Sequence, residues 1–267
     1  MKIIFLGTGP IRKIPRKDCF CLTCQKAREG DKKSARTRSS LLLQFKDKYL
    51  LFDISPDFQK QIQREKIKKI ETIFLTHGHF DAIGGIKEAQ KFFQKTKQRM
   101  SLFLEKKTQK TLFKKFPSLK KRKNFLSFYF LKPHKALSIL GLKIIPFRVS
   151  HDFRLNFPTL GFKIGKDLIY ASDFKRIPVS AFKYLRGIKM AVLDGAMYFK
   201  KQIFSHSNIE ETIKLGEKLK IKNLYLTQIS HTYPPYQTAQ KEIKNYLQKN
   251  KIKIKVFLTY DRMKINL

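Results

Sequence analysis

The sequence has no tryptophan, only three cysteines, few acidic residues and no long apolar run. No stretch approaches the about 18 consecutive apolar residues that a membrane-spanning helix requires, so we expect no transmembrane segment. Residues 2–6 read as a short strand, and the N-terminus lacks the long apolar region and small-residue cleavage site of a secretory signal. These absences predict a soluble protein of the cytoplasm.

The three cysteines are confined to one short segment and cannot link distant parts of the chain through disulfides. Cys19, Cys21 and Cys24 lie within six positions, and no other cysteine occurs. In the reducing compartment predicted above, clustered thiols are more typical of a metal site than of a disulfide framework. The spacing favours metal binding over inert or redox-active thiols.

Acidic residues are outnumbered: 58 lysines and arginines face 20 aspartates and glutamates, which gives a formal net charge of +38. Such a charge attracts polyanions. Lysine outnumbers arginine more than threefold, however, and the chain is rich in Phe and Ile, as biased codons of an AT-rich genome would produce. Specific phosphate recognition favours the guanidinium fork of arginine. Composition therefore favours codon bias over a dedicated nucleic-acid-binding surface as the origin of the positive charge. Nucleic acid remains open as a partner.

The chain contains no repeat of fixed period and no linker rich in Pro, Gly or Ser, which predicts one domain over residues 1–267. The segment 106–135 is dense in Lys and Phe, and we interpret it as a solvated helix face rather than a basic lid. Apolar patterns predict more strands than helices, with the helices between the strands, as in two sheets packed face to face. We expect strands at 2–6, 40–45, 49–52, 71–76, 101–104, 125–130, 142–147, 159–164, 167–171, 190–193, 223–227 and 253–258, and helices at 57–66, 83–93, 207–218 and 238–248.

A cluster of metal-ligating residue types follows the expected strand at 71–76. The sequence there is His77-Gly78-His79-Phe80-Asp81, followed by Ala82-Ile83-Gly84-Gly85. Two imidazoles two positions apart can converge on one ion, and the carboxylate can face a neighbouring position. The segment resembles the His-x-His-x-Asp-His signature of the metallo-β-lactamase superfamily. That resemblance implies an α/β fold, the four-layer αβ/βα sandwich, and a metal-dependent hydrolase.

The same resemblance assigns ligands elsewhere in the chain. It implies that His77, His79 and His151 hold the first metal ion, either zinc or manganese, and that Asp173 bridges to a second. Asp53 looks like the family's acidic residue beneath the histidine loop, where it would orient an imidazole. A turn or helix cap is the alternative role for Asp53.

The cysteine segment narrows the resemblance. Cys19-Phe20-Cys21-Leu22-Thr23-Cys24 is similar to the additional zinc site of the phosphoribosyl cyclic phosphodiesterases, in which a histidine near the C-terminus completes the tetrahedron. Here His231 is the candidate, which would give a closed structural Cys₃His zinc site.

Two departures from the family pattern fall on ligands of the second metal alone. Ala82 replaces the last histidine of the signature, and Gln228 replaces the histidine of a later Leu-Thr-His-x-Ser-His segment. An alanine cannot ligate, and a neutral amide is a poor substitute for imidazole on zinc. With only Asp81 and the shared Asp173 remaining, we expect one firmly held catalytic ion and a weak or absent second one.

The resemblance implies hydrolysis of a small cyclic or nucleotide-type phosphodiester. Asp81, freed from full ligation, would orient or deprotonate the attacking water, and His206 matches the family histidine proposed to bind phosphate or protonate the leaving group. A solvent-exposed histidine, or one hydrogen-bonded near the start of a helix, is the alternative for His206. An RNA-processing nuclease of this fold and a catalytically silent metal-binding module are the rival functions, and the sequence leaves the oligomeric state open, a homodimer included.

Overall fold

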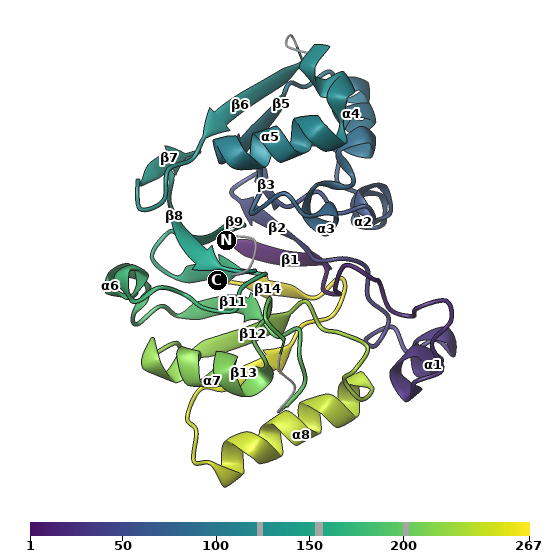
Figure 1. Ribbon diagram of the computed structural model, residues 1–267, viewed down its shortest axis with the longest axis vertical. Helices are drawn as coiled ribbons and strands as arrows, with labels where there is room; N and C mark the ends of the chain where they lie inside the picture. Colours follow the sequence, from purple (N-terminus) through teal and green to yellow (C-terminus); the bar gives the residue numbers. More distant parts are fainter. Residues whose placement is uncertain (122–124, 153–156, 200–202) are drawn as a thin grey trace.

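Two seven-stranded β-sheets lie face to face, with helices on their outer sides (Figure 1). The computed structural model describes residues 1–121, 125–152, 157–199 and 203–267. The first sheet has the order β14 (Lys264–Asn266), β1 (Lys2–Gly7), β2 (Ser40–Phe45), β3 (Lys48–Phe52), β4 (Thr72–Phe74), β5 (Met100–Leu104) and β6 (Leu126–Phe130). The second has the order β13 (Lys255–Leu258), β12 (Asn223–Thr227), β11 (Met190–Asp194), β10 (Leu168–Ala171), β9 (Pro158–Ile164), β8 (Leu142–Ser150) and β7 (Leu137–Ile139).

The helices form the two outer layers, which confirms the predicted αβ/βα arrangement. The first sheet is covered by α2 (Phe58–Arg64), α3 (Phe80–Ile83), α4 (Ile86–Lys95), α5 (Lys106–Lys115) and the 3₁₀ turn η1 (Pro117–Lys121). The second is covered by η2 (Val179–Ala181), α6 (Phe182–Leu185), α7 (Ile209–Lys218) and α8 (Tyr236–Lys249). A further short helix, α1 (Leu22–Arg28), projects from one edge of the molecule. Among the described residues, no helix has the length and apolar character needed to cross a bilayer.

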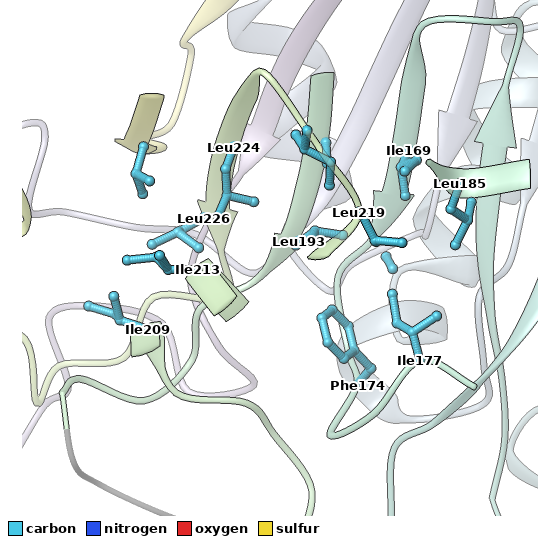
Figure 2. Packing of buried hydrophobic residues seen from close by; sticks show 14 of the residues in the cluster. Ile169, Phe174, Ile177, Leu185, Leu193, Ile209, Ile213, Leu219, Leu224 and Leu226 are labelled. Carbon is cyan, nitrogen blue, oxygen red and sulfur yellow. The ribbon is translucent and has the colours of Figure 1, made fainter. Parts of the chain in front are cut away.

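Alternation along the strands builds separate apolar layers, because successive side chains of a strand point to opposite faces. Ile3 and Phe5 of β1 join the core between the sheets, whereas Ile4 and Leu6 join the core under the helices of the first sheet. The outer core of the second sheet is built in the same way, from β10, β11 and β12 packed against α7 and the segment after β10 (Figure 2).

The strands predicted at 40–45 and 49–52 are confirmed, and they form a hairpin in which β2 and β3 pair antiparallel through Phe45 and Lys48. The helix predicted over 83–93 is wrong in its start: α3 ends at Ile83, and α4 begins at Ile86 after two glycines. The Gly85 amide donates to the Ile54 carbonyl, and a Cβ at Gly85 would lie 2.1 Å from the Ser55 carbonyl oxygen. This close approach breaks the helix, a contact that periodicity does not report.

The lysine-rich segment 106–135 begins with α5, which turns its lysines to solvent and buries Thr108 and Leu112. The predicted solvated helix face is therefore confirmed for α5, while residues 122–124 lie outside the described part of the chain. Lys115 at the end of α5 also contacts the protein, because its Nζ donates to the Gly78 carbonyl at 3.1 Å. The helix thus rests against the loop that carries His77 and His79.

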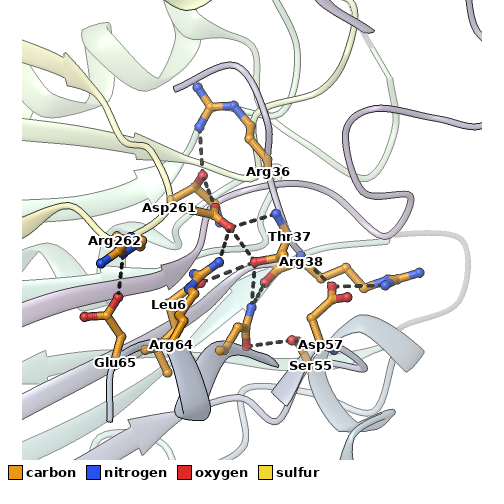
Figure 3. A network of polar contacts seen from close by, with 12 residues as sticks. Leu6, Arg36, Thr37, Arg38, Ser55, Asp57, Arg64, Glu65, Asp261 and Arg262 are labelled. Atoms are coloured by element: carbon orange, nitrogen blue, oxygen red, sulfur yellow. Dashed lines mark hydrogen bonds and ion pairs between the residues drawn. The ribbon is translucent and has the colours of Figure 1, made fainter. Parts of the chain in front are cut away.

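A polar network around Asp261 ties the C-terminal segment to the loops after β1 and before β2 (Figure 3). Its Oδ1 accepts from the Thr8 amide at 3.0 Å and the Thr8 hydroxyl at 2.9 Å, and its Oδ2 accepts from the Thr37 amide at 2.9 Å. Arg64 Nη1 lies 3.1 Å from the same Oδ2, and the buried Arg36 donates to the Thr8 hydroxyl at 2.8 Å. One carboxylate therefore positions both loops that lead toward the site.

We predict that Asp261→Ala lowers the free energy of unfolding by about 2–4 kcal/mol, since it removes the acceptor of the Thr37 amide, the Thr8 hydroxyl and Arg64 Nη1. Urea unfolding followed by circular dichroism measures the loss. Asp47→Ala, in the exposed turn between β2 and β3, is the matched control and should change stability by less than about 0.5 kcal/mol. Equal losses for the two variants would contradict the assigned role of the network.

Candidate metal centres

Chemically active side chains gather where several strands of the two sheets end. His77 and His79 follow β4, and His151 follows β8. In the second sheet, β10, β11 and β12 run parallel, so their carboxyl ends meet at one edge. Asp173 follows β10 and Gln228 follows β12 at that edge. The predicted residues are therefore brought together by strand direction.

The three predicted histidines form one cluster. The ring centroids of His77 and His79 lie 4.7 Å apart, and that of His151 lies 5.2 Å from the first and 5.0 Å from the second. One ring nitrogen from each lies within 4.8 Å of the others, with His151 Nε2 3.1 Å from His79 Nδ1. His77 Nε2 is buried and has no hydrogen-bond partner in the described part of the chain.

Burial keeps two of these rings neutral, because a charged imidazole is costly to desolvate. It lowers the pKa of His77 to about 3 and that of His79 to about 4. The His79 ring also stacks on Phe157 at 4.2 Å between centroids. Neutral imidazoles present lone pairs, which is the state that a metal ligand requires.

Hydrogen bonds fix the orientation of two of the rings. The Thr76 hydroxyl lies 2.7 Å from His77 Nδ1 and 2.9 Å from Asp53 Oδ2, and the Thr76 amide donates to Asp53 Oδ1 at 2.8 Å. Asp53 therefore reaches His77 through Thr76 rather than directly, and burial raises the pKa of this carboxyl well above its usual value. His151 Nδ1 donates to the Ser205 carbonyl at 2.8 Å. Both arrangements leave Nε2 available.

The carboxylates of Asp81 and Asp173 differ in their surroundings. Asp81 is buried in the first turn of α3, its Oδ1 has no hydrogen-bond partner among the described residues, and burial together with Asp173 raises its pKa. Burial also acts to raise the pKa of Asp173, but the neighbouring imidazoles outweigh it and the net shift is downward. Asp173 is therefore held as a carboxylate.

The two departures from the family pattern have clear structural consequences. Gln228 is buried, with Nε2 donating to Asp173 Oδ1 at 2.7 Å. Ala82 is buried in the apolar cluster under α2 and α4. The Gln228 amide group thus occupies one oxygen of the carboxylate that was predicted to bridge two ions.

His206 lies beside the cluster, where its ring centroid is 4.8 Å from that of His151. Its Nδ1 is 2.6 Å from Asp194 Oδ2, and one of its ring nitrogens falls within 4.8 Å of ligand atoms of His151 and Asp173. Burial acts to lower the pKa of His206, but the Asp194 carboxylate outweighs it and the pKa rises to about 9. The alternative of a solvent-exposed histidine is wrong.

Asp194 was missed by the sequence analysis. It is fully buried at the end of β11, and its carboxylate also accepts from the amides of Phe174 and Ala196. The sequence feature that could have identified Asp194 is its place at the end of an apolar strand. Asp173 has a similar place after the neighbouring strand β10. His134, which matches no motif, is exposed and contacts Tyr184 away from the centre.

A second cluster is formed by the three cysteines and His231. Their four ligand atoms lie within 4.8 Å of one another, with His231 Nδ1 3.2 Å from Cys19 Sγ and 3.5 Å from Cys21 Sγ. Cys21 precedes α1 and Cys24 lies inside it, so the helix turn brings the thiols together. The cysteine segment and the histidine that the resemblance assigned to it are thus adjacent in space, although far apart in sequence.

Comparison with known proteins agrees with this geometry. The family described as the beta-lactamase superfamily domain matches residues 48–229. A solved diphosphatase from the PhnP family is 29% identical, with a TM-score of 0.85 over 100% of this chain and 97% of its own. Two further solved structures share the fold. Zinc-bound PqqB from Methylobacterium extorquens is 18% identical, with a TM-score of 0.83 over 100% of both chains. The short form of human tRNase Z is 17% identical, with a TM-score of 0.72 over 100% of this chain and 99% of its own.

A curated relative, an octanoyltransferase of Porphyromonas gingivalis, is 27% identical over 243 residues. The match covers 89% of this chain and 47% of the relative. The chain therefore spans about half the length of this curated relative.

We predict that Gln228→Leu lowers the free energy of unfolding of metal-free protein by about 1–3 kcal/mol, because it leaves a buried oxygen of Asp173 without its donor. Urea unfolding in the presence of a chelator measures this loss. Gln248→Leu on the exposed face of α8 is the matched control, with an expected change below about 0.5 kcal/mol. A Gln228 variant as stable as the control would show that the amide does not hold Asp173.

Proposed function

The chain belongs to the beta-lactamase superfamily, and we propose that it is a metal-dependent hydrolase that cleaves a small cyclic or nucleotide-type phosphodiester. One observation carries the proposal: three imidazoles converge at the ends of strands from both sheets, with ring nitrogens within 4.8 Å of one another. His77 Nε2 has no hydrogen-bond partner among the described residues, and the pKa of the nearby Asp173 carboxyl is lowered. The identity of 29% to a diphosphatase over the whole chain supports phosphorus chemistry. Human tRNase Z is similar in fold alone and does not favour the RNA-processing alternative.

The residues present fit a divalent ion. His77 Nε2 and Asp81 Oδ1 are buried polar atoms that lack a partner among the described residues, which is costly unless a cation completes them. His77, His79, His151 and Asp173 would hold zinc or manganese, since imidazole and carboxylate suit both. When bound, the ion lowers the pKa of a water molecule and polarises a phosphoryl oxygen.

One catalytic ion follows from what surrounds the second position. Of the residues that the resemblance assigns to the second position, only Asp81 and Asp173 are retained, and Gln228 already donates to one oxygen of Asp173. Among the described residues, Asp173 groups with His151 and His206, and Asp81 belongs to no such group of three or more possible ligands. Asp81 is then available to accept a proton from the attacking water, and its raised pKa suits it to that role better than an ordinary aspartate. The Cys₃His cluster would hold a separate structural zinc, as its closed set of four ligands suggests.

His206 is the proposed proton donor to the leaving oxygen. Asp194 is bonded to Nδ1 and holds the ring as an imidazolium, so that Nε2 can donate toward a phosphodiester placed between His151 and Asp173. The amides of Phe174 and Ala196 fix the Asp194 carboxylate in turn. The pair therefore supplies a positive charge and a proton close to the position at which the family pattern has its second ion.

We predict that zinc- or manganese-loaded protein hydrolyses bis(p-nitrophenyl) phosphate or a 2′,3′-cyclic nucleotide, and that His77→Ala abolishes turnover. His134→Ala, which removes an exposed histidine outside the centre, is the matched control and should retain turnover within about twofold.

His206→Gln should lower kcat roughly 100-fold or more with little change in KM, because a proton donor acts in the transition state. Release of p-nitrophenol, or chromatography of the nucleotide product, measures both effects.

The result that would overturn the proposal is a metal-loaded wild-type protein that turns over no phosphodiester. That outcome would favour the catalytically silent module. A His206→Gln variant that raises KM without lowering kcat would instead assign His206 to substrate binding.

A further inference from the structure

Arginine is unevenly distributed along this lysine-rich chain. Residues 12–38 contain five arginines and five lysines, whereas the remainder contains eight arginines and forty lysines. Codon bias acts on the whole chain and does not explain a local excess. Arginine differs from lysine in its planar fork of donors, which suits backbone carbonyls and phosphates.

Three of these arginines give the loop before α1 a fixed shape. Arg28 donates to the Arg16 carbonyl at 3.1 Å and the Cys19 carbonyl at 2.6 Å. Arg38 donates through Nε to the Ile11 carbonyl at 2.8 Å and pairs with Asp57 at 3.0 Å. Arg36 is buried in the Asp261 network shown in Figure 3. These contacts and the Cys₃His cluster hold the loop from both ends.

Arg12 and Arg16 have no such structural role. They line an open hollow of about 450 Å³ together with Lys13, Lys17 and Arg38, and Asp18 is its acidic lining residue. Arg16 Nε is buried and has no hydrogen-bond partner in the described part of the chain, and no described carboxylate lies in ion-pair range of either guanidinium. The hollow therefore presents converging donors in need of an anion.

Apolar side chains on the same loop are exposed rather than buried. Phe20 is 81% exposed, Leu22 57% and Ile11 51%. The Arg28 guanidinium lies 5.9 Å from the centroid of the Phe20 ring. Phe20 follows Cys19, which lines the hollow, and exposed aromatic rings beside a basic groove are surfaces on which the bases of a single strand stack.

We propose that this hollow binds the phosphate backbone of a single-stranded nucleic acid, with a base stacked on Phe20. Arg12 and Arg16 grip consecutive phosphates, and Lys13 and Lys17 add charge at the rim. The loop connects to the histidine centre, because Ser39, next to Arg38, contacts the Thr227 hydroxyl at 3.3 Å, and Gln228 follows. Binding at this hollow does not require the hydrolysis proposed above.

Fluorescence anisotropy with a short labelled oligothymidylate tests the site directly, on full-length zinc-loaded protein, with the probe checked for integrity afterwards. Arg12→Gln/Arg16→Gln should weaken binding about tenfold and reduce the slope of log K against log salt by about 1.4, since two phosphate contacts are lost. Lys91→Gln/Lys95→Gln on exposed α4 removes the same charge and should reduce affinity less than about twofold. Phe20→Ala should weaken binding about tenfold at an unchanged salt slope.

Each alternative outcome rejects the proposal. Equal losses in the two double variants would mean that net charge alone attracts the strand. Equal affinity for duplex of the same sequence, or full competition by inorganic phosphate at matched concentration, would assign the hollow to phosphate without a strand. A Phe20→Ala variant that binds normally but changes oligomeric state in analytical ultracentrifugation would identify the exposed face as a contact between copies. Thermal unfolding and zinc content confirm that each variant is folded.

Discussion

The desolvation of charge around the histidine cluster is the constraint on which the rest of the site depends. Asp53, Asp81, Asp173 and Asp194 are all buried, and isolated carboxylates are costly in such surroundings. Three of them are compensated within the chain. Asp53 accepts from Thr76, Asp194 from His206 and two amides, and Asp173 from Gln228 in a field of imidazoles. Asp81 Oδ1 and His77 Nε2 have no hydrogen-bond partner among the described residues, and a cation held by the imidazoles would satisfy His77.

Continuous apolar layers surround this concentration of polar groups and stabilise the fold that holds them together. The core between the sheets and the two outer cores pack against β4, β8, β10, β11 and β12 and so fix the positions of their ends. The Asp261 network and the glycine pair after α3 then set the loops at this edge. Within the centre, the Asp194 carboxylate holds the His206 ring beside His151 and Asp173.

The sequence predicted the parts of the site that motifs and strand ends encode. His77, His79, His151 and Asp173 were identified because they follow apolar strands in the family's order, and His231 because the family that the cysteine segment resembles has a histidine ligand near the C-terminus. The β2–β3 hairpin and most strands were likewise predictable from alternation. What could not be predicted depends on contacts between distant segments: Asp194 beneath His206, the Gln228 amide on Asp173, and the helix break at Gly84 and Gly85, where the backbone of residues 54–56 approaches.

The central claim is that this chain holds one catalytic ion and one structural zinc, and native mass spectrometry of protein purified without chelators tests it most directly. The account predicts two ions per chain in wild type, one lost in His77→Ala and the other in Cys21→Ser, and a third gained when Ala82→His and Gln228→His restore the second position. Three ions in the wild-type chain, or two retained in His77→Ala, would contradict it.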